Sequence, residues 1–250
     1  MGNLVIWQTS LLLLMCFSVA VFRVELLPFK GFAAIFGLSL VASTAIAAVV
    51  LFKFVTGAQS SLEYSALSLV FALAVIGSIA YLLKQIAAAP HIHDISTNLV
   101  DIPQFTRAQA LRKTGDNSLA ASDDVTRQQK VAYPQLKTLL ITSSIGEAVK
   151  KSVDTAQQLG WKVHFIDEVA GLIEATYTST LFGFIDDIVI RVRYLDTDTD
   201  TDTDTDTDTE TETETKTTVE IDLRSASRVG ESDLGANAQR IKEFGTLLTK

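Results

Sequence analysis

Apolar positions dominate the first third of the chain in three uninterrupted runs. Residues 4–22, 31–52 and 64–83 contain no Asp, Glu, Lys or Arg. A helix needs about 20 such residues to cross the hydrocarbon core of a bilayer. Only helices and closed barrels satisfy their backbone polar groups there. We therefore predict a transmembrane region over residues 1–86, with three membrane-spanning helices.

Two other interpretations of these runs are weaker. Three buried helices of a soluble protein would need a polar shell that the short connections cannot supply. The first run could be a signal peptide, because Ser18, Val19 and Ala20 resemble a cleavage site. A signal peptide, however, begins with basic residues, and residues 1–10 contain neither Lys nor Arg. We predict a retained helix.

The pattern becomes polar after the third run. Residues 87–143 carry Pro103, Gly115 and Pro134 among many polar side chains, which is typical of loops. We expect this region to be an extended linker, within which residues 137–142 could form an edge strand of the sheet that follows.

From residue 144 to residue 250 the periodicity alternates between that of helices and that of strands. Apolar positions at helical spacing predict helices at the start and end of this region, the second capped by Ser232 or Asp233. Strict alternation of apolar and polar positions predicts four strands, over residues 161–165, 173–178, 187–194 and 219–224.

These elements predict an α+β fold. Short connections favour an antiparallel four-stranded meander, and the two helices should cover its apolar face to give a small two-layer domain. The expected core is Val149, Val153, Trp161, Val163, Phe165, Ile173, Ile188, Ile190, Val192, Ile221, Leu223, Leu234, Ile241 and Phe244.

An acidic repeat interrupts this domain between the third and fourth strands. Residues 196–215 alternate Thr with ten carboxylates, seven Asp and three Glu. Like charges that bury no apolar surface predict a disordered loop. A calcium-binding role is the alternative, but calcium sites need converging oxygens, which a strict alternation does not provide.

The repeat also explains the formal net charge of −8, because without it 19 acidic residues face 21 basic ones. The chain has no basic stripe, so we expect no nucleic-acid partner.

Composition limits the chemistry as well. Cys16 is the only cysteine and lies in the first apolar run, so the soluble part has neither a cysteine nucleophile nor a thiolate zinc site. Neither a Gly-rich phosphate loop nor a nucleophile elbow occurs. His91, His93 and Asp94 form a short run that lacks a further metal ligand. We assign no catalytic residue, cofactor or metal site.

Several short segments after residue 91 resemble the bacterial and plastid family named domain of unknown function 1499. They are residues 92–97, 133–134, 160–161, 171–176, 182–193 and 224–237. Asn98, which stands where this family usually has an acid, and the acidic repeat depart from the pattern. The resemblance implies membrane helices before the domain but no activity.

The resemblance also implies a domain that faces away from the cytoplasm. The Lys and Arg count of the loops favours the opposite side by a single residue, and we follow the resemblance. We expect an integral protein of the bacterial inner membrane, or its equivalent, with the soluble domain extracytoplasmic.

Charged side chains gather on the polar face of the predicted sheet and near the membrane exit. The candidate polar cluster comprises His93, Asp94, Glu174, Asp186, Asp187, Arg191, Arg193, Arg224 and Arg228. It could be a solvated salt-bridge ladder, or the arginines could bind an anionic ligand or partner. Adjacent strand residues point to opposite faces, so Asp186 should face the apolar side, as a hydrogen-bond hub for Arg228 or a helix N-terminus.

The leading hypothesis is a membrane-anchored, non-catalytic binding or assembly domain of the cell envelope. Its expected partners are the lipid bilayer and a protein partner, or a homo-oligomer in the membrane. The alternative is a membrane-tethered hydrolase or metal-assisted enzyme that uses His93, Asp94 and Asp186.

Overall fold

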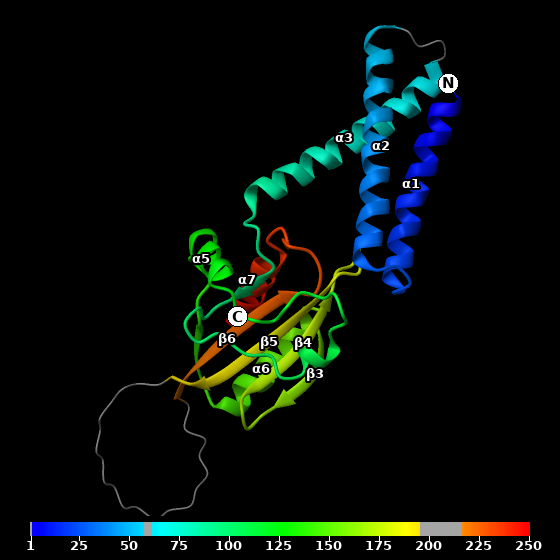
Figure 1. Cartoon of the computed structure of the whole chain (residues 1–250). Coiled ribbons are helices and arrows are strands. Elements are labelled where there is room, and N and C mark those ends of the chain that lie inside the picture. The colour runs from blue at the N-terminus through cyan, green and yellow to red at the C-terminus, as the bar shows by residue number, and fades with distance from the viewer. Residues whose placement is uncertain (1, 58–61, 196–216) are drawn as a thin grey trace, which may run out of the picture. The chain divides into compact units, whose positions relative to one another are not determined.

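The computed structural model describes residues 2–57, 62–195 and 217–250 (Figure 1). The acidic repeat, expected to be a disordered loop, lies outside the described residues. The chain divides into two units: Met1–Ala89 with Ser179–Phe184, and Pro90–Thr178 with Ile185–Lys250.

The first unit contains three long helices, α1 (Gly2–Arg23), α2 (Phe29–Val55) and α3 (Leu62–Ala88). In α1 and α2, Leu4–Arg23 and Phe29–Val55 are long and apolar enough to cross a membrane, with mean hydropathies of 2.1 and 2.4. Among the described residues α3 adds only the shorter apolar stretch Ala72–Ala88. At 1.5 Å per residue this is about 26 Å, less than the ~30 Å core of a bilayer. The described residues therefore contain two candidate spans, not the predicted three.

Small side chains line the buried side of α2. Ser39, Ser43 and Ala47 recur every four residues and are buried. Ala47 packs in one cluster with Ala72 of α3 and Leu4 of α1. Small residues let helices approach closely, so the smooth face of α2 serves packing among the helices of this chain.

The second unit is a mixed domain built on an antiparallel sheet. Its elements are β1 (Asp94–Ser96), α4 (Ala108–Leu111), α5 (Asp123–Ala132), β2 (Leu139–Ser143), α6 (Ile145–Gln158), β3 (Lys162–Asp167), β4 (Leu172–Thr178), β5 (Ile185–Tyr194), β6 (Thr217–Ser227) and α7 (Ala236–Leu248).

The sheet has six strands in the order β1-β6-β5-β4-β3, and β2 also pairs with β6. The prediction of four strands is therefore wrong, although the meander from β3 to β6 was predicted. The two strands beyond the predicted four, β1 and β2, lie in residues 87–143. β2 matches the optional edge strand at 137–142, whereas β1 has three residues and is too short for an alternating pattern to be recognised.

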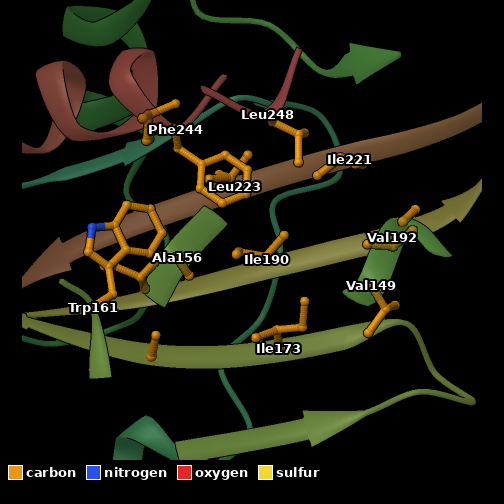
Figure 2. Packing of buried hydrophobic residues seen from close by; sticks show 14 of the residues in the cluster. Val149, Ala156, Trp161, Ile173, Ile190, Val192, Ile221, Leu223, Phe244 and Leu248 are labelled. Carbon is orange, nitrogen blue, oxygen red and sulfur yellow. The ribbon is translucent and has the colours of Figure 1, made fainter. Parts of the chain in front are cut away.

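The apolar core lies between one face of the sheet and helices α6 and α7. Figure 2 shows Phe244 and Leu248 of α7 over Ile221 and Leu223 of β6, and all four belong to one buried cluster. The Trp161 ring stacks on Phe244 with centroids 5.3 Å apart. Each fully buried side chain of this size contributes roughly 1.5–3 kcal/mol, so this face supplies most of the hydrophobic stabilisation of the domain.

One expected core residue lies on the other face. The register of β3 against β4 shifts between Val163 and Phe165, which pair with Ala175 and Glu174. This bulge inserts His164 as an extra residue and reverses the alternation after it. Phe165 therefore lies on the polar face, where the Arg107 guanidinium sits 4.9 Å from its ring centroid.

A comparison of two turn glycines separates the cost of a strained backbone from the cost of a steric overlap. Gly160 and Gly171 both have positive φ, +76° and +61°. A Cβ on Gly160 would meet nothing within 4 Å, whereas one on Gly171 would overlap the Val192 carbonyl oxygen. We expect Gly160→Ala to cost about 1 kcal/mol of unfolding free energy and Gly171→Ala roughly 1–3 kcal/mol more.

Denaturant unfolding of the full chain in detergent checks this prediction. Trp161 fluorescence follows the domain once Trp7, the other tryptophan, is replaced by Phe in every variant. Equal losses for the two alanine variants would contradict the overlap.

Candidate functional site

The polar face of the sheet is a buried layer of charge. Seven of the nine candidate residues lie on this face, six by strand alternation and Arg228, just after β6, by its hydrogen bonds to Asp187. They are Asp94, Glu174, Asp187, Arg191, Arg193, Arg224 and Arg228. Residues 97–119, which we call the covering segment, make hydrogen bonds to this face along most of its length. Glu174 and Asp187 are consequently fully buried, so the face is not a solvated ladder.

Arg224 of β6 joins the sheet to two points of the covering segment, Pro103 and Leu119. Its Nε and Nη2 donate to the two oxygens of Asp94 at 3.0 and 2.7 Å, a bidentate pair. The same guanidinium donates to the Pro103 and Leu119 carbonyls at 3.2 and 2.7 Å. The cation therefore satisfies backbone acceptors that would otherwise be buried without a donor.

Glu174 of β4 binds backbone donors of the covering segment, whereas Arg224 binds backbone acceptors. Its carboxylate accepts hydrogen bonds from the backbone N–H groups of Thr106, Arg107 and Ala108, at 2.5 to 3.1 Å. The Thr106 hydroxyl adds a further hydrogen bond at 2.6 Å. Three successive N–H groups at the start of α4 carry partial positive charge, so this acid holds the covering segment without a cationic side chain.

Asp187 of β5 lies between two arginines. Arg112 Nε donates to its Oδ2 at 2.8 Å, and Arg228 Nη2 donates to its Oδ1 at 2.7 Å. Burial lowers the pKa of Arg112, and the Arg228 charge adds to this effect, while Asp187 opposes it. One carboxylate thus compensates two buried cations.

The most exposed part of the layer is a charge network at its rim. Arg191 donates to Asp222 at 2.9 Å and to the Asp101 carbonyl at 2.7 Å. Arg193 bonds to Asp101 and Glu220 at 2.5 and 2.8 Å. The side chains of Arg193 and Asp101 are 38% and 56% exposed.

Electrostatics at the rim favour the charged forms. The hydrogen bond from Arg193 is the largest influence on Asp101 and lowers the pKa of that carboxyl below its usual 3.8. The same hydrogen bond raises the pKa of Arg193. Asn98, where the resembling family usually has an acid, donates to Asp222 at 3.3 Å.

Asp186 lies on the opposite face, beneath α7. Its carboxylate accepts a hydrogen bond from Arg240 Nη2 at 2.6 Å. Arg240 also bonds to Ser225 and Asn237 and lies over the Tyr177 ring at 4.4 Å. Asp186 is buried on the apolar face, as its position suggested, but its carboxylate pairs with Arg240 instead of acting as a hub for Arg228 or a helix N-terminus. Arg228 pairs with Asp187.

The N-cap of α7 is Gly235, and not Ser232 or Asp233, the two predicted candidates. Asp233 lies two residues before this N-cap. Its carboxylate accepts from the backbone N–H groups of Gly235 and Asn237, each at 2.8 Å. Burial is the main cause that raises its pKa above 3.8. Burial also raises the pKa of Tyr133, and Asp233 adds to that effect.

The three residues of the enzyme alternative do not come together. Asp94 pairs across the ladder with Ala226, whereas Asp186 pairs with Ser227, so the two acids point to opposite faces of the sheet. The His93 carbonyl, rather than its ring, accepts hydrogen bonds from Ser227 and Asn237. Among the described residues no group of three or more His, Cys, Asp or Glu is placed to hold a metal ion.

Sequence reasoning missed Asp101, Arg112 and Arg240. Asp101 and Arg112 lie in an irregular segment, where no periodicity shows which way a side chain points. Arg240 carried a signal: it lies one residue before Ile241 and four before Phe244, on the apolar side of α7. A cation there and an acid, Asp186, on the apolar sheet face predict each other, because a buried charge needs a partner.

Comparison with known proteins gives one family. The family model described as Protein of unknown function (DUF1499) matches residues 94–248. This range begins at β1 and ends at the last residue of α7, so it includes the covering segment and both faces of the sheet. A search of curated proteins returns no match to the chain.

The arrangement around Asp187 predicts a large effect of removing one acid. Asp187→Ala leaves Arg112 and Arg228 buried without a carboxylate, and we expect it to cost about 3–5 kcal/mol of unfolding free energy. Arg193→Ala, at the exposed rim, should cost less than about 1 kcal/mol. Denaturant titration in detergent measures both, and losses of similar size would show that the layer is not held by buried charge.

The raised pKa of Asp233 predicts a pH-dependent difference between wild type and Asp233→Asn. An acid whose folded pKa is raised reduces stability as pH increases, beginning at its unfolded value near 3.8 and ending at its folded pKa. Asparagine does not titrate. We therefore expect the stability of Asp233→Asn relative to wild type to rise across this interval, in unfolding measurements from acid to neutral pH. A difference that is constant with pH would be incompatible with a desolvated carboxyl.

Proposed function

The chain belongs to the family described as Protein of unknown function (DUF1499), and from this premise we propose a membrane-tethered, non-catalytic domain that docks a protein partner in the cell envelope. One observation carries the proposal. The candidate charges on the polar face are hydrogen-bonded to side chains or backbone of their own domain. A catalytic group must be able to form a hydrogen bond with its substrate. These groups already use their donors and acceptors in hydrogen bonds within the domain.

The same observation narrows the kind of partner. An anionic ligand would compete with Asp101, Glu220 and Asp222 for Arg191 and Arg193. A protein that binds through apolar side chains need not displace these carboxylates. This favours a protein over a small anion.

The surface that fits such a partner is the rim. We define the rim surface as Val100, Asp101, Val169, Arg193 and Glu220. Val100, which precedes Asp101 in the chain, and Val169 are almost fully exposed. The β3–β4 turn that carries Val169 is joined to β5, next to Arg193 in the chain, by the hydrogen bond from Val192 N–H to the Gly171 carbonyl, 2.7 Å. Exposed apolar side chains among paired charges are typical of protein interfaces.

The helices α1 and α2 would hold this domain at a membrane. Their length and hydropathy support membrane anchoring. From the family resemblance we propose that the domain faces away from the cytoplasm, at the bacterial inner membrane or its equivalent.

Cysteine crosslinking in intact cells tests side and partner together. Val100→Cys is made in a Cys16→Ser background and treated with a membrane-impermeant maleimide that carries a photoreactive group. We expect labelling from outside and, on illumination, a covalent adduct with one protein. Val131→Cys, also highly exposed but on α5, should be labelled without forming that adduct.

Arg193→Asp in the Val100→Cys chain should weaken the adduct. Labelling only after permeabilisation would overturn the proposed side. Labelling without an adduct would overturn the docking surface.

A further inference from the structure

The turn between β4 and β5 is unusually apolar for a hairpin end. It contains Leu181, Phe182 and Phe184, and Leu181 is 68% exposed. Ser179 shapes the turn, since its N–H donates to the Phe184 carbonyl at 2.8 Å and its hydroxyl accepts from the Phe184 N–H at 2.9 Å. A single exposed apolar side chain is common on a protein surface, so the significance of Leu181 depends on what lies beside it.

This turn, Ser179–Phe184, belongs to the first unit together with α1 and α2. Phe182 and Phe184 stack at 5.2 Å. Phe184 contacts Phe22 at the end of α1, with ring centroids 5.7 Å apart. Phe182 contacts Phe32 and Phe36 of α2 at 6.1 and 5.6 Å.

Arg23 adds a polar clasp to these ring contacts. It is the last residue of α1, and its Nη1 donates to the Thr180 carbonyl at 2.6 Å, with longer contacts to Ser179 and Leu181 carbonyls. The guanidinium thereby donates hydrogen bonds to backbone carbonyls of the turn. The N–H groups of Ser179, Gly183 and Phe184 already bond to acceptors within the turn. The turn is held by both apolar and polar contacts at one position.

That position lies between two consecutive candidate spans. Leu4–Arg23 ends and Phe29–Val55 begins there. A connection between successive spans lies at the boundary between water and hydrocarbon. Val24 and Leu26 of the same connection are also exposed apolar residues, so Leu181 is one of three that face outward at this boundary.

We propose that the Ser179–Phe184 turn is a membrane-interface anchor, with Leu181 in contact with lipid. The occupant of its exposed apolar surface is the bilayer, because the residues that hold the turn are the ends of the helices that the bilayer covers. This inference rests on the membrane anchoring in the proposed function and adds a lipid contact made by the turn within the first unit.

Depth-dependent quenching tests the proposal on the full chain. Leu181→Cys in a Cys16→Ser background is labelled with an environment-sensitive fluorophore and reconstituted into phosphatidylcholine vesicles. We expect brominated phosphatidylcholine to quench this label several-fold more than a label on Val169→Cys. Val169 is the matched control, because it is 98% exposed in the turn at the other end of β4.

A third label separates this inference from the proposed anchoring. Leu38→Cys lies within the α2 span and is 72% exposed, so brominated lipid should quench it strongly. Quenching at Leu38 but equal weak quenching at Leu181 and Val169 would overturn the interface anchor alone. Absence of quenching at all three would overturn the membrane anchoring as well.

Discussion

The second unit depends on mutual satisfaction between buried charges and an irregular stretch of backbone. The covering segment has little regular structure besides the four residues of α4, so its N–H and C=O groups lack the partners that a helix or sheet provides. Glu174 accepts from three of its N–H groups, and Arg224 donates to two of its carbonyls. Neither the side chains nor the segment could be buried alone, because each would leave polar groups without partners.

The two faces of the sheet therefore stabilise the domain differently. Helices α6 and α7 bury apolar side chains, which contribute free energy roughly in proportion to area. Buried ion pairs lose much of their attraction to desolvation, so the opposite face adds less net stability than its many contacts suggest. Its charges determine instead which segment lies where, since Asp187 accepts Arg112 only when the covering segment is in place.

The sequence predicts features that depend on residues close together in the chain better than contacts between distant residues. Alternation along one strand is local, so β4, β5 and β6 and the side that Ile173, Ile190 and Leu223 face were predictable. The bulge at His164 was not, because it depends on how β3 pairs with β4. Arg112 and Asp187 are 75 residues apart, and no pattern within 97–119 indicates that pair. The pairing of Asp186 with Arg240 was predictable, because the two residues are opposite charges on two apolar surfaces that face each other.

The number of unused hydrogen-bond donors and acceptors in the charged layer also indicates where a partner can bind. A carboxylate offers about four lone-pair sites. Glu174 fills its sites with N–H groups and a hydroxyl, and Asp187 receives two guanidinium groups; a ligand at either would first have to displace part of the fold. Asp101 and Arg193 are different, because water already reaches both side chains. Exchange of that water for a partner breaks no internal hydrogen bond, so the rim is the part of the charged layer at which recognition costs the fold nothing.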